Sequence, residues 1–490
     1  MNKMTRFILA GLPALALAAG FNACFLGLLE RPPLDQALLM FFLAGPLAFI
    51  FFSILNKKTT LSGERAAAPI PWKYPLLDNL PGILLGLLFF GIYLAYGMQL
   101  KQISVAQVDN LFDADVASWI RRISAPDVKD FEMRGPHPFT YFIFRPFGWL
   151  LNLITNSPPL SAIILNTFAG GLCVFLAWLF VKHRFQNSTY AFLIAALLGL
   201  STSHLVFGSV VETYIFSALS MILFYYLLQT NPSSTASVVF ASVMTFGITL
   251  TNFIQNCVGY IVFRPRWRDI FRFIAWALSI SIILSFLHTA VYPASKLFLL
   301  PSSVENEFKF FTGLSKLPTW RIIGRIIQLV RTFSLYTVIA PDVFVLRDEV
   351  GSYIPEFNFY KIVPGTFSHS GYDGLGQFLV IVWVAILLVA GSSVIWNLVR
   401  TRKVDLPIAF ALCIAFNFIL HIDYGQELFL YSPDWAYAVI FFVAFGLAPV
   451  RENRFFQAGF LLFLILLAYN QWQFMQTIIE ALKPYMSIAG

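Results

Sequence analysis

The sequence predicts an all-α polytopic membrane protein, on the strength of three observations. Hydrophobic residues make up 58% of its 490 residues and charged residues only 12%, whereas soluble domains carry about 25% charged residues. The mean hydropathy is +0.74. The apolar residues form continuous runs rather than the short alternating strands of a membrane β-barrel. Soluble, disordered and disulfide-rich classes are therefore excluded.

Each apolar run is compared with the roughly 20 residues that a spanning helix needs. The run 237–263 has a polar middle and is expected to form two helical pieces. With it, the sequence predicts about 11 to 13 transmembrane helices. The other predicted spans are 7–29, 38–55, 80–99, 160–182, 189–208, 212–230, 270–291, 375–397, 405–422, 433–449 and 456–475.

Lysine and arginine give the orientation. They are concentrated in alternate loops, including Lys182/Arg184, Arg264–Arg268 and Arg400–Lys403. Because basic residues favour the cytoplasmic side, this pattern places the N-terminus in the cytoplasm. The net charge of +8 is thereby explained by topology, and no nucleic-acid partner is expected.

The chain is predicted to have three parts. Residues 1–55 form a two-helix membrane hairpin, 56–79 a proline-containing cytoplasmic linker, and 80–490 the main transmembrane domain. Two long loops, about 100–159 and 293–373, fall on the outer side in this topology. Loops of that length within a compact protein are usually functional.

The first outer loop contains an acidic pair and an apolar segment. Asp113 and Asp115 could supply a general base or bind a divalent cation. The alternative is a helix cap followed by a solvated helix face. The segment 138–155 is interrupted by Arg145 and Pro146, so we expect a helix on the outer membrane surface rather than a span.

Two further motifs carry polar groups at the same side. Arg134 and the proline-bracketed His137 could hold a phosphate or a hydroxyl, or His137 could be packed for shape alone. Glu212 and Tyr214 stand at the mouth of a predicted span. A carboxylate at that depth needs a partner or water, although the pair could also be an interfacial anchor.

Two later segments complete the candidate set. The turn 421–435 is rich in acids and aromatic rings, among them Glu427 and Tyr431, and this mixture suits either sugar recognition or an aromatic belt. In the helix expected at 320–331, Arg321, Arg325 and Gln328 share one face. That face could contact a lipid phosphate or serve as ordinary interfacial anchoring.

The absence of several motifs is also informative. The sequence contains no phosphate-binding P-loop, no dinucleotide-binding glycine pattern and no His-Glu-x-x-His zinc motif. Direct use of a nucleotide cofactor is therefore not expected.

Span 80–99, the pair Asp113/Asp115, the helix 138–155 and span 160–182 follow one another in an order that resembles the GT-C glycosyltransferases, integral membrane enzymes that use polyprenyl-phosphate-linked sugars. Four short motifs look more closely like a group of bacterial membrane proteins of this type: Ala114–Val116, Val211–Tyr214, Ile248–Asn252 and Phe429–Ser432. The chain looks like the protein O-mannosyltransferases, the aminoarabinose lipid A transferases and related bacterial membrane proteins over roughly residues 80–450. It departs from the aminoarabinose transferases by lacking their Glu-Lys-Pro in the first loop.

The resemblance implies a GT-C-like helical bundle whose two outer loops bear surface helices. It implies inverting sugar transfer on the periplasmic face of a bacterial inner membrane, with Asp115 as general base and Asp113 as the second choice. Trp119 stands four residues after Asp115, the spacing that the family's essential aspartate usually has. The substrate-binding residues would be Arg122, Arg134, His137, Glu212, Tyr214, Asn252, Arg321, Arg325, Glu427 and Tyr431.

The expected partners are a lipid-linked sugar, an acceptor that is a lipid, glycan or protein, and membrane lipids. No metal ligand set is predicted, and Mg²⁺ or Mn²⁺ at the acidic pair is the one cofactor considered. Two alternatives are a transporter or flippase for a lipid or glycolipid, and a non-catalytic partner in envelope polysaccharide assembly. A transporter would require alternating access.

Overall fold

The computed structural model describes residues 42–50, 76–106, 110–128, 131–230, 234–346 and 354–486, together with Ala14 and Ala18. The predicted hairpin 1–55 and linker 56–79 therefore lie largely outside the described residues. The chain divides into two compact units. Unit 1 comprises 1–73, 127–144 and 227–309, and unit 2 comprises 74–126, 145–226 and 310–490.

The structure confirms an all-α polytopic membrane fold. By length and composition, six described helices can cross a membrane, or seven if one bent pair counts as a single span. These long helices are α3 (Leu76–Ala106), α6 (Pro158–Phe185), α12 (Trp267–Val291), α15 (Gly374–Thr401), α16 (Leu406–Asp423) and α18 (Arg454–Met486). The bent pair is α7 (Ser188–Leu200) and α8 (Thr202–Ser209).

Shorter helices complete the described chain. Several predicted spans are shorter than expected, which is why fewer long helices are found than the sequence suggests. The shorter helices are α4 (Val116–Ser124), α5 (Thr140–Thr155), α9 (Tyr214–Thr230), α10 (Thr235–Ile248), α11 (Phe253–Phe263), α13 (Pro301–Glu307), α14 (Thr319–Arg331) and α17 (Pro433–Gly446). Single turns are η1 (Leu250–Asn252), η2 (Phe308–Phe310), η3 (Leu314–Lys316), η4 (Thr332–Tyr336), η5 (Phe429–Tyr431) and η6 (Ala448–Val450).

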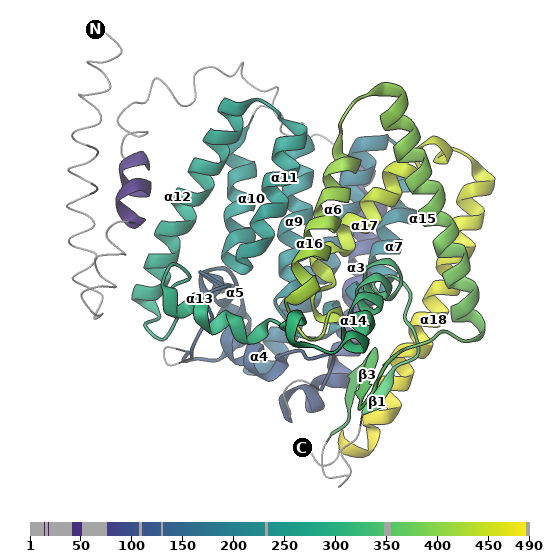
Figure 1. Ribbon diagram of the computed structural model, residues 1–490, viewed down its shortest axis with the longest axis horizontal. Coiled ribbons are helices and arrows are strands. Elements are labelled where there is room, and N and C mark those ends of the chain that lie inside the picture. Colours follow the sequence, from purple (N-terminus) through teal and green to yellow (C-terminus); the bar gives the residue numbers. More distant parts are fainter. Residues whose placement is uncertain are drawn as a thin grey trace. The chain divides into compact units, whose positions relative to one another are not determined.

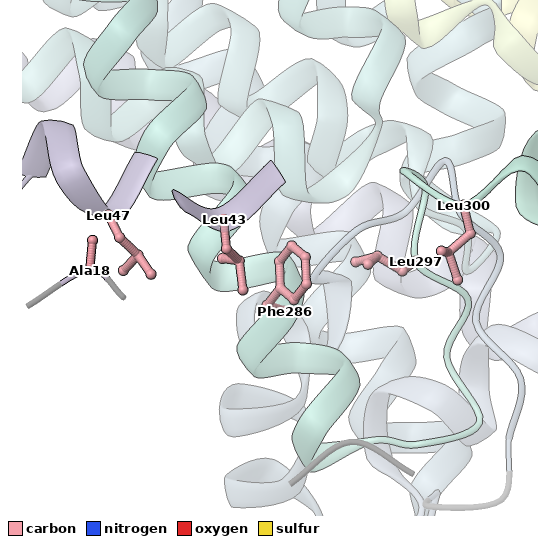
Figure 2. Close-up of a cluster of buried hydrophobic side chains, with 6 residues drawn as sticks. All are labelled: Ala18, Leu43, Leu47, Phe286, Leu297 and Leu300. Atoms are coloured by element: carbon pink, nitrogen blue, oxygen red, sulfur yellow. The ribbon is translucent and has the colours of Figure 1, made fainter. Parts of the chain in front are cut away.

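Unit 1 contains α10, α11 and α12, with both α10 and α11 packed on α12. The predicted break in 237–263 is confirmed, since Thr249 ends α10 in an extended conformation before the single turn η1. The described helical segment 42–50 also belongs to this unit. Figure 2 shows its Leu43 and Leu47 in a buried apolar cluster with Phe286 of α12.

Unit 2 is built around α6, which packs against both α3 and α7, while α17 packs against α15 and α16. Its helix ends follow ordinary capping rules. The Ser157 hydroxyl accepts from the Leu160 amide at the start of α6, with Pro158 at the first helical position. The Asn187 side chain accepts from the Tyr190 amide and so starts α7. Figure 1 shows α4, α14 and the strands gathered at one end of these helices.

The predicted span 189–208 is not one straight helix. It bends by 62° between α7 and α8. Ser201 stands at the bend, where it ends α7 and its hydroxyl caps α8 at His204. A serine side chain can form hydrogen bonds with nearby backbone groups and so interrupt a helix. Ser201 was therefore a local signal for the bend, although it lies within a continuous apolar run.

Two small antiparallel sheets in the long loop 293–373 were not predicted. β1 (Phe344–Leu346) pairs with β2 (Glu356–Asn358), and β3 (Tyr360–Val363) pairs with β4 (Thr366–His369). Gly365, at φ +79°, permits the tight turn of the second hairpin. The helices predicted at 138–155 and 320–331 are confirmed as α5 and α14.

We expect Gly446→Ala to destabilise the protein. A Cβ at Gly446 would lie 2.5 Å from the Ala390 carbonyl oxygen of α15, and neither backbone can move without repacking both helices. The loss should be about 1–3 kcal/mol, measured as denaturant unfolding in detergent. Gly391→Ala in α15 is the control, because nothing lies within 4 Å of its added Cβ. Equal effects of the two substitutions would contradict this packing.

Candidate functional site

The acidic pair Asp113 and Asp115 lies on a strained turn in unit 2. Phe112 and Asp113 both have positive φ, at 56° and 62°. Left-handed backbone at a non-glycine residue costs free energy, about 1–3 kcal/mol for each such position. Two such residues in succession persist only where the surroundings hold them.

The surroundings are a strand and a set of aromatic rings. The Phe112 amide donates to the Phe357 carbonyl at 3.1 Å, and the Phe357 amide donates to the Asn110 carbonyl at 2.9 Å. The Phe112 ring is fully buried, with ring centroids 4.8 Å from Phe359 and 5.1 Å from Phe429. These contacts fix the turn that presents Asp113 and Asp115.

Asp115 occupies the N-cap position of α4, yet its side chain makes no capping hydrogen bond. Asp113 and Asp115 are both exposed. The Asp115 side chain therefore does not cap α4, which was the alternative role considered for it. Its carboxylate remains available for another role.

Glu212 is the first of two buried carboxyl groups beside this turn. It is only 4% exposed and lies between α8 and α9. Its Oε1 accepts from the Thr213 hydroxyl at 3.2 Å, whereas Oε2 is buried and has no hydrogen-bond partner among the described residues. The pKa of Glu212 is raised to about 8, mainly by burial and also by the negative charge of Asp115, while Arg122 opposes the shift.

Asn166 of α6 holds the backbone around Glu212. Its amide nitrogen lies within hydrogen-bond distance of three carbonyl oxygens at the end of α8, those of Phe207, Gly208 and Val210. Its Oδ1 accepts from the Glu212 amide at 3.3 Å. The buried Asn166 side chain thus provides hydrogen-bond partners for backbone carbonyl groups before Glu212 and for the Glu212 amide itself.

Glu427 is the second buried carboxyl group, at 2% exposure. Its Oε1 accepts from the Phe429 amide at 2.9 Å. Its pKa is raised to about 8, mainly by burial and also by the negative charge of Asp113, while the hydrogen bond from the Phe429 amide and the charge of Arg325 oppose the shift. Burial also raises the pKa of the nearby Tyr360 hydroxyl, and Glu427 and Asp113 add to that shift.

Each exposed aspartate therefore interacts with a different buried glutamate. Asp115 acts on Glu212, and Asp113 acts on Glu427. At neutral pH the raised pKa values keep the two glutamates largely protonated, so each can donate a hydrogen bond.

Arg325 organises the turn that contains Glu427. Its guanidinium donates to the carbonyl oxygens of His421, Tyr424, Gly425 and Gln426. Gly425 is required there, since φ is +81° and a Cβ would lie 2.5 Å from the Tyr431 ring. Arg325 and Gln328, two residues of the predicted polar face of α14, are both buried. This part of the face therefore points into the protein. Arg325 shapes the turn rather than standing open to a lipid phosphate.

Aromatic side chains accompany the carboxyl groups. Tyr214 and Tyr431 have ring centroids 5.2 Å apart, and His421 lies 4.6 Å from Tyr431. Two of the predicted cations in this unit lie over rings. Arg122 is 5.0 Å from the Trp119 centroid, and Arg321 is 5.3 Å from that of Trp320.

Three of the predicted site residues, Arg134, His137 and Asn252, belong to unit 1. Arg134 forms an ion pair with Glu307. His137 donates from Nδ1 to the Ile248 carbonyl at 2.6 Å, so the histidine loop meets the break between α10 and α11. At that break, Asn252 accepts at 2.8 Å from Gln255. The structure thus brings the predicted motif around His137 into contact with the predicted motif Ile248–Asn252.

No group of three or more His, Cys, Asp and Glu side chains within the described parts of the chain is arranged to hold a metal ion. No protein-family model and no curated protein matches the chain.

Sequence reasoning missed Asn166 and Tyr360. Asn166 had a signal, because a lone amide in a long apolar run needs a partner. Tyr360 had none, since its position beside Glu427 and Asp113 depends on the unpredicted sheet that begins with β3.

We expect the stability of the protein to fall as pH rises, because of Glu212 and Glu427. Their folded pKa values of about 8 exceed the ordinary value of 4.5, so the folded state binds these protons more tightly than the unfolded state. The stabilisation is fully present below about pH 4.5 and is lost as pH rises through about 8. Thermal unfolding across this range should show a shallower slope in the double variant Glu212→Gln/Glu427→Gln.

The control for this experiment is Glu452→Gln, at an exposed position in the turn before α18. It should leave the wild-type slope unchanged. Parallel pH profiles for the wild type and the double variant would contradict the buried, protonated state of the glutamates.

Asn166→Leu should destabilise the α8–α9 turn, because Leu has similar volume but no hydrogen-bonding group. Unmet buried backbone groups cost about 1–3 kcal/mol. Thr167→Val is the matched control, since the Thr167 hydroxyl bonds only to carbonyls of its own helix. Chemical denaturation should separate the two variants, and equal losses would argue against the tethering role of Asn166.

Proposed function

We propose that the protein is a membrane glycosyltransferase that moves a sugar from a polyprenyl-phosphate donor to an acceptor hydroxyl on the outer face of the membrane. One observation carries the proposal. Asp113 and Asp115 are exposed on one strained turn, and each interacts with a different buried glutamate. Strained backbone and perturbed carboxyl groups cluster at functional sites.

Asp115 is the proposed general base. Its carboxylate takes the proton of the acceptor hydroxyl, and the hydroxyl oxygen forms a bond to the anomeric carbon of the sugar. The bond from that carbon to the phosphate oxygen breaks, so the configuration inverts and polyprenyl phosphate leaves. The exposure of Asp115 and the lack of a capping hydrogen bond support this role.

The buried glutamates have a complementary role in this proposal. A protonated carboxyl donates a hydrogen bond, as an ionised one cannot. The unpartnered Oε2 of Glu212 is suited to orienting a substrate hydroxyl beside Asp115. The partly exposed ring of Tyr431, against which the buried ring of Tyr214 packs, provides a surface on which a sugar can stack.

The departing phosphate requires positive charge. Arg122 is the cation favoured here, because its charge acts on Glu212 and hence on the same site. Arg321 is a second candidate from α14, and a divalent cation at the aspartates is a further source of charge. The bacterial inner membrane, a cytoplasmic N-terminus and a periplasmic site belong to the same proposal.

Asp115→Asn should abolish sugar transfer, since the amide keeps the shape but cannot accept the proton. General base catalysis contributes about 10²–10⁴-fold, so the rate should fall by at least that lower factor. The assay uses the full chain in nanodiscs with a polyprenyl-phosphate sugar, and it measures released polyprenyl phosphate together with labelled acceptor. Asp113→Asn, which tolerates positive φ, should have a smaller effect, and Glu452→Gln should have none.

Undiminished transfer by Asp115→Asn would remove Asp115 from the catalytic role. Movement of the lipid-linked sugar across the membrane without any transfer would instead favour a flippase.

A further inference from the structure

Unit 1 contains its own group of buried polar side chains, none of which belongs to the acidic turn. Several of them have side-chain atoms with no hydrogen-bond partner among the residues that the structure describes. We call Thr249, Asn256, Tyr260, Ser281 and His288 the polar set, and each is more than nine-tenths buried. A buried polar atom without a partner is costly, and most of all within a membrane. The polar set therefore points to a ligand.

The α11 members of the polar set lie on the side of that helix that meets α12. The rings of Phe253 and Tyr260 both stack on Phe273 of α12, with centroids 6.3 Å and 4.1 Å from it. Asn256 shares this face of α11, because it stands three residues after Phe253 and four before Tyr260. Its side chain is completely buried, and neither its oxygen nor its nitrogen has a partner among the described residues. The Asn256 amide is thus one helical turn from the Tyr260 hydroxyl, on the α12 side.

The α12 members of the polar set continue along the same side. Ser281 and His288 are seven residues apart, so they share one face of α12, and Phe273 lies on that face eight residues before Ser281. The opposite face carries Phe286, which packs against the described helical segment 42–50 (Figure 2). Because α10 and α11 both pack on α12, the polar face of α12 is the one on their side.

His288 is the member of the polar set with the least ordinary surroundings. Its ring centroid lies 5.3 Å from that of Tyr141, 5.2 Å from Phe142 and 5.2 Å from Tyr292. Both imidazole nitrogens are buried and lack a hydrogen-bond partner in the described part of the chain. A neutral imidazole has one N–H donor and one acceptor nitrogen. The His288 ring therefore needs one partner that accepts and another that donates.

The chemistry and the extent of the polar set define its ligand. Hydroxyl, amide and neutral imidazole groups carry no charge and offer both donors and acceptors, so a neutral molecule with the same capacity fits them. Tyr260 stacks on Phe273, and His288 stands fifteen residues beyond Phe273 on α12, which is about 22 Å along the helix axis. A compact solute does not reach across that distance, whereas a row of water molecules does.

We infer that unit 1 binds a chain of water molecules along the buried side of α12, with the polar set as its hydrogen-bonding groups. Buried waters in proteins bond to polar groups that would otherwise be unsatisfied. Thr249, at the end of α10, supplies a hydroxyl from the third helix. Because α12 is a candidate span, the chain brings water into the membrane interior, where polar groups typically mark the route of a solute or a proton. This inference does not depend on the proposed transferase activity.

Radiolytic footprinting of the full chain in detergent tests for this water. X-ray pulses turn water into hydroxyl radicals, so a buried side chain is oxidised only where water lies beside it. Tyr260 and His288 should be oxidised severalfold faster than Tyr93. Tyr93 is the matched control, because it is as buried as Tyr260, at 0% exposure, but its hydroxyl donates to the Gly199 carbonyl at 2.8 Å. Each rate is divided by the rate for the same residue in the urea-unfolded chain.

Asn256→Leu keeps the size of the side chain and removes its hydrogen-bonding groups. It should lower the oxidation of Tyr260 severalfold, because the waters beside Tyr260 lose their next partner. Asn417→Leu, the same change at a buried asparagine of α16 in unit 2, should leave Tyr260 oxidation unchanged. Ser281→Ala is a milder second variant with the same expected direction as Asn256→Leu. Continued protection of Tyr93 shows that each variant is folded.

Two results would overturn the inference. One is oxidation of Tyr260, of His288 or of both at the slow rate of Tyr93, since a dry residue at either end is incompatible with the chain. The other is wild-type oxidation of Tyr260 in the folded variants Asn256→Leu and Ser281→Ala. Because the footprint reports water alone, its outcome is separate from that of the transfer assay.

Discussion

The hydrogen bond from the Phe112 amide to the Phe357 carbonyl is the contact on which the candidate site depends. Left-handed backbone at Phe112 and Asp113 is unfavourable in isolation. The strand around Phe357 and the rings around Phe112 make it the best available conformation. Without that support the turn would relax, and Asp113 and Asp115 would lose their defined places.

The same turn explains why residues far apart in sequence act together. Asp115 interacts with the α8–α9 turn through Glu212, and Asp113 interacts with the α16–α17 turn through Glu427. The two turns are anchored separately, by Asn166 in one case and by Arg325 in the other. Burial of each glutamate has a desolvation cost, which the protein meets by keeping the carboxyl group protonated. Both glutamates are therefore favoured in the neutral form at neutral pH.

Much of this fold was predictable, because apolar length and periodicity report directly on spanning and amphipathic helices. The break at Thr249–Asn252 and the helix α14 followed from local pattern alone. The strands were not predictable, since β3 depends on pairing with β4 in a loop of ordinary composition. Similarly, the sequence placed Arg325 on a polar helix face, but only the tertiary structure shows that backbone carbonyls occupy its guanidinium. Local signals identify candidate residues, whereas the partners of those residues are non-local.

The most direct measurement of the central claim is an experimental structure of the full chain with polyprenyl phosphate bound. The account predicts that the phosphate lies beside the turn of Asp113 and Asp115, with an Asp115 carboxylate oxygen facing the place of the sugar. A phosphate bound elsewhere, with this turn closed to the ligand or relaxed from its left-handed conformation, would contradict it.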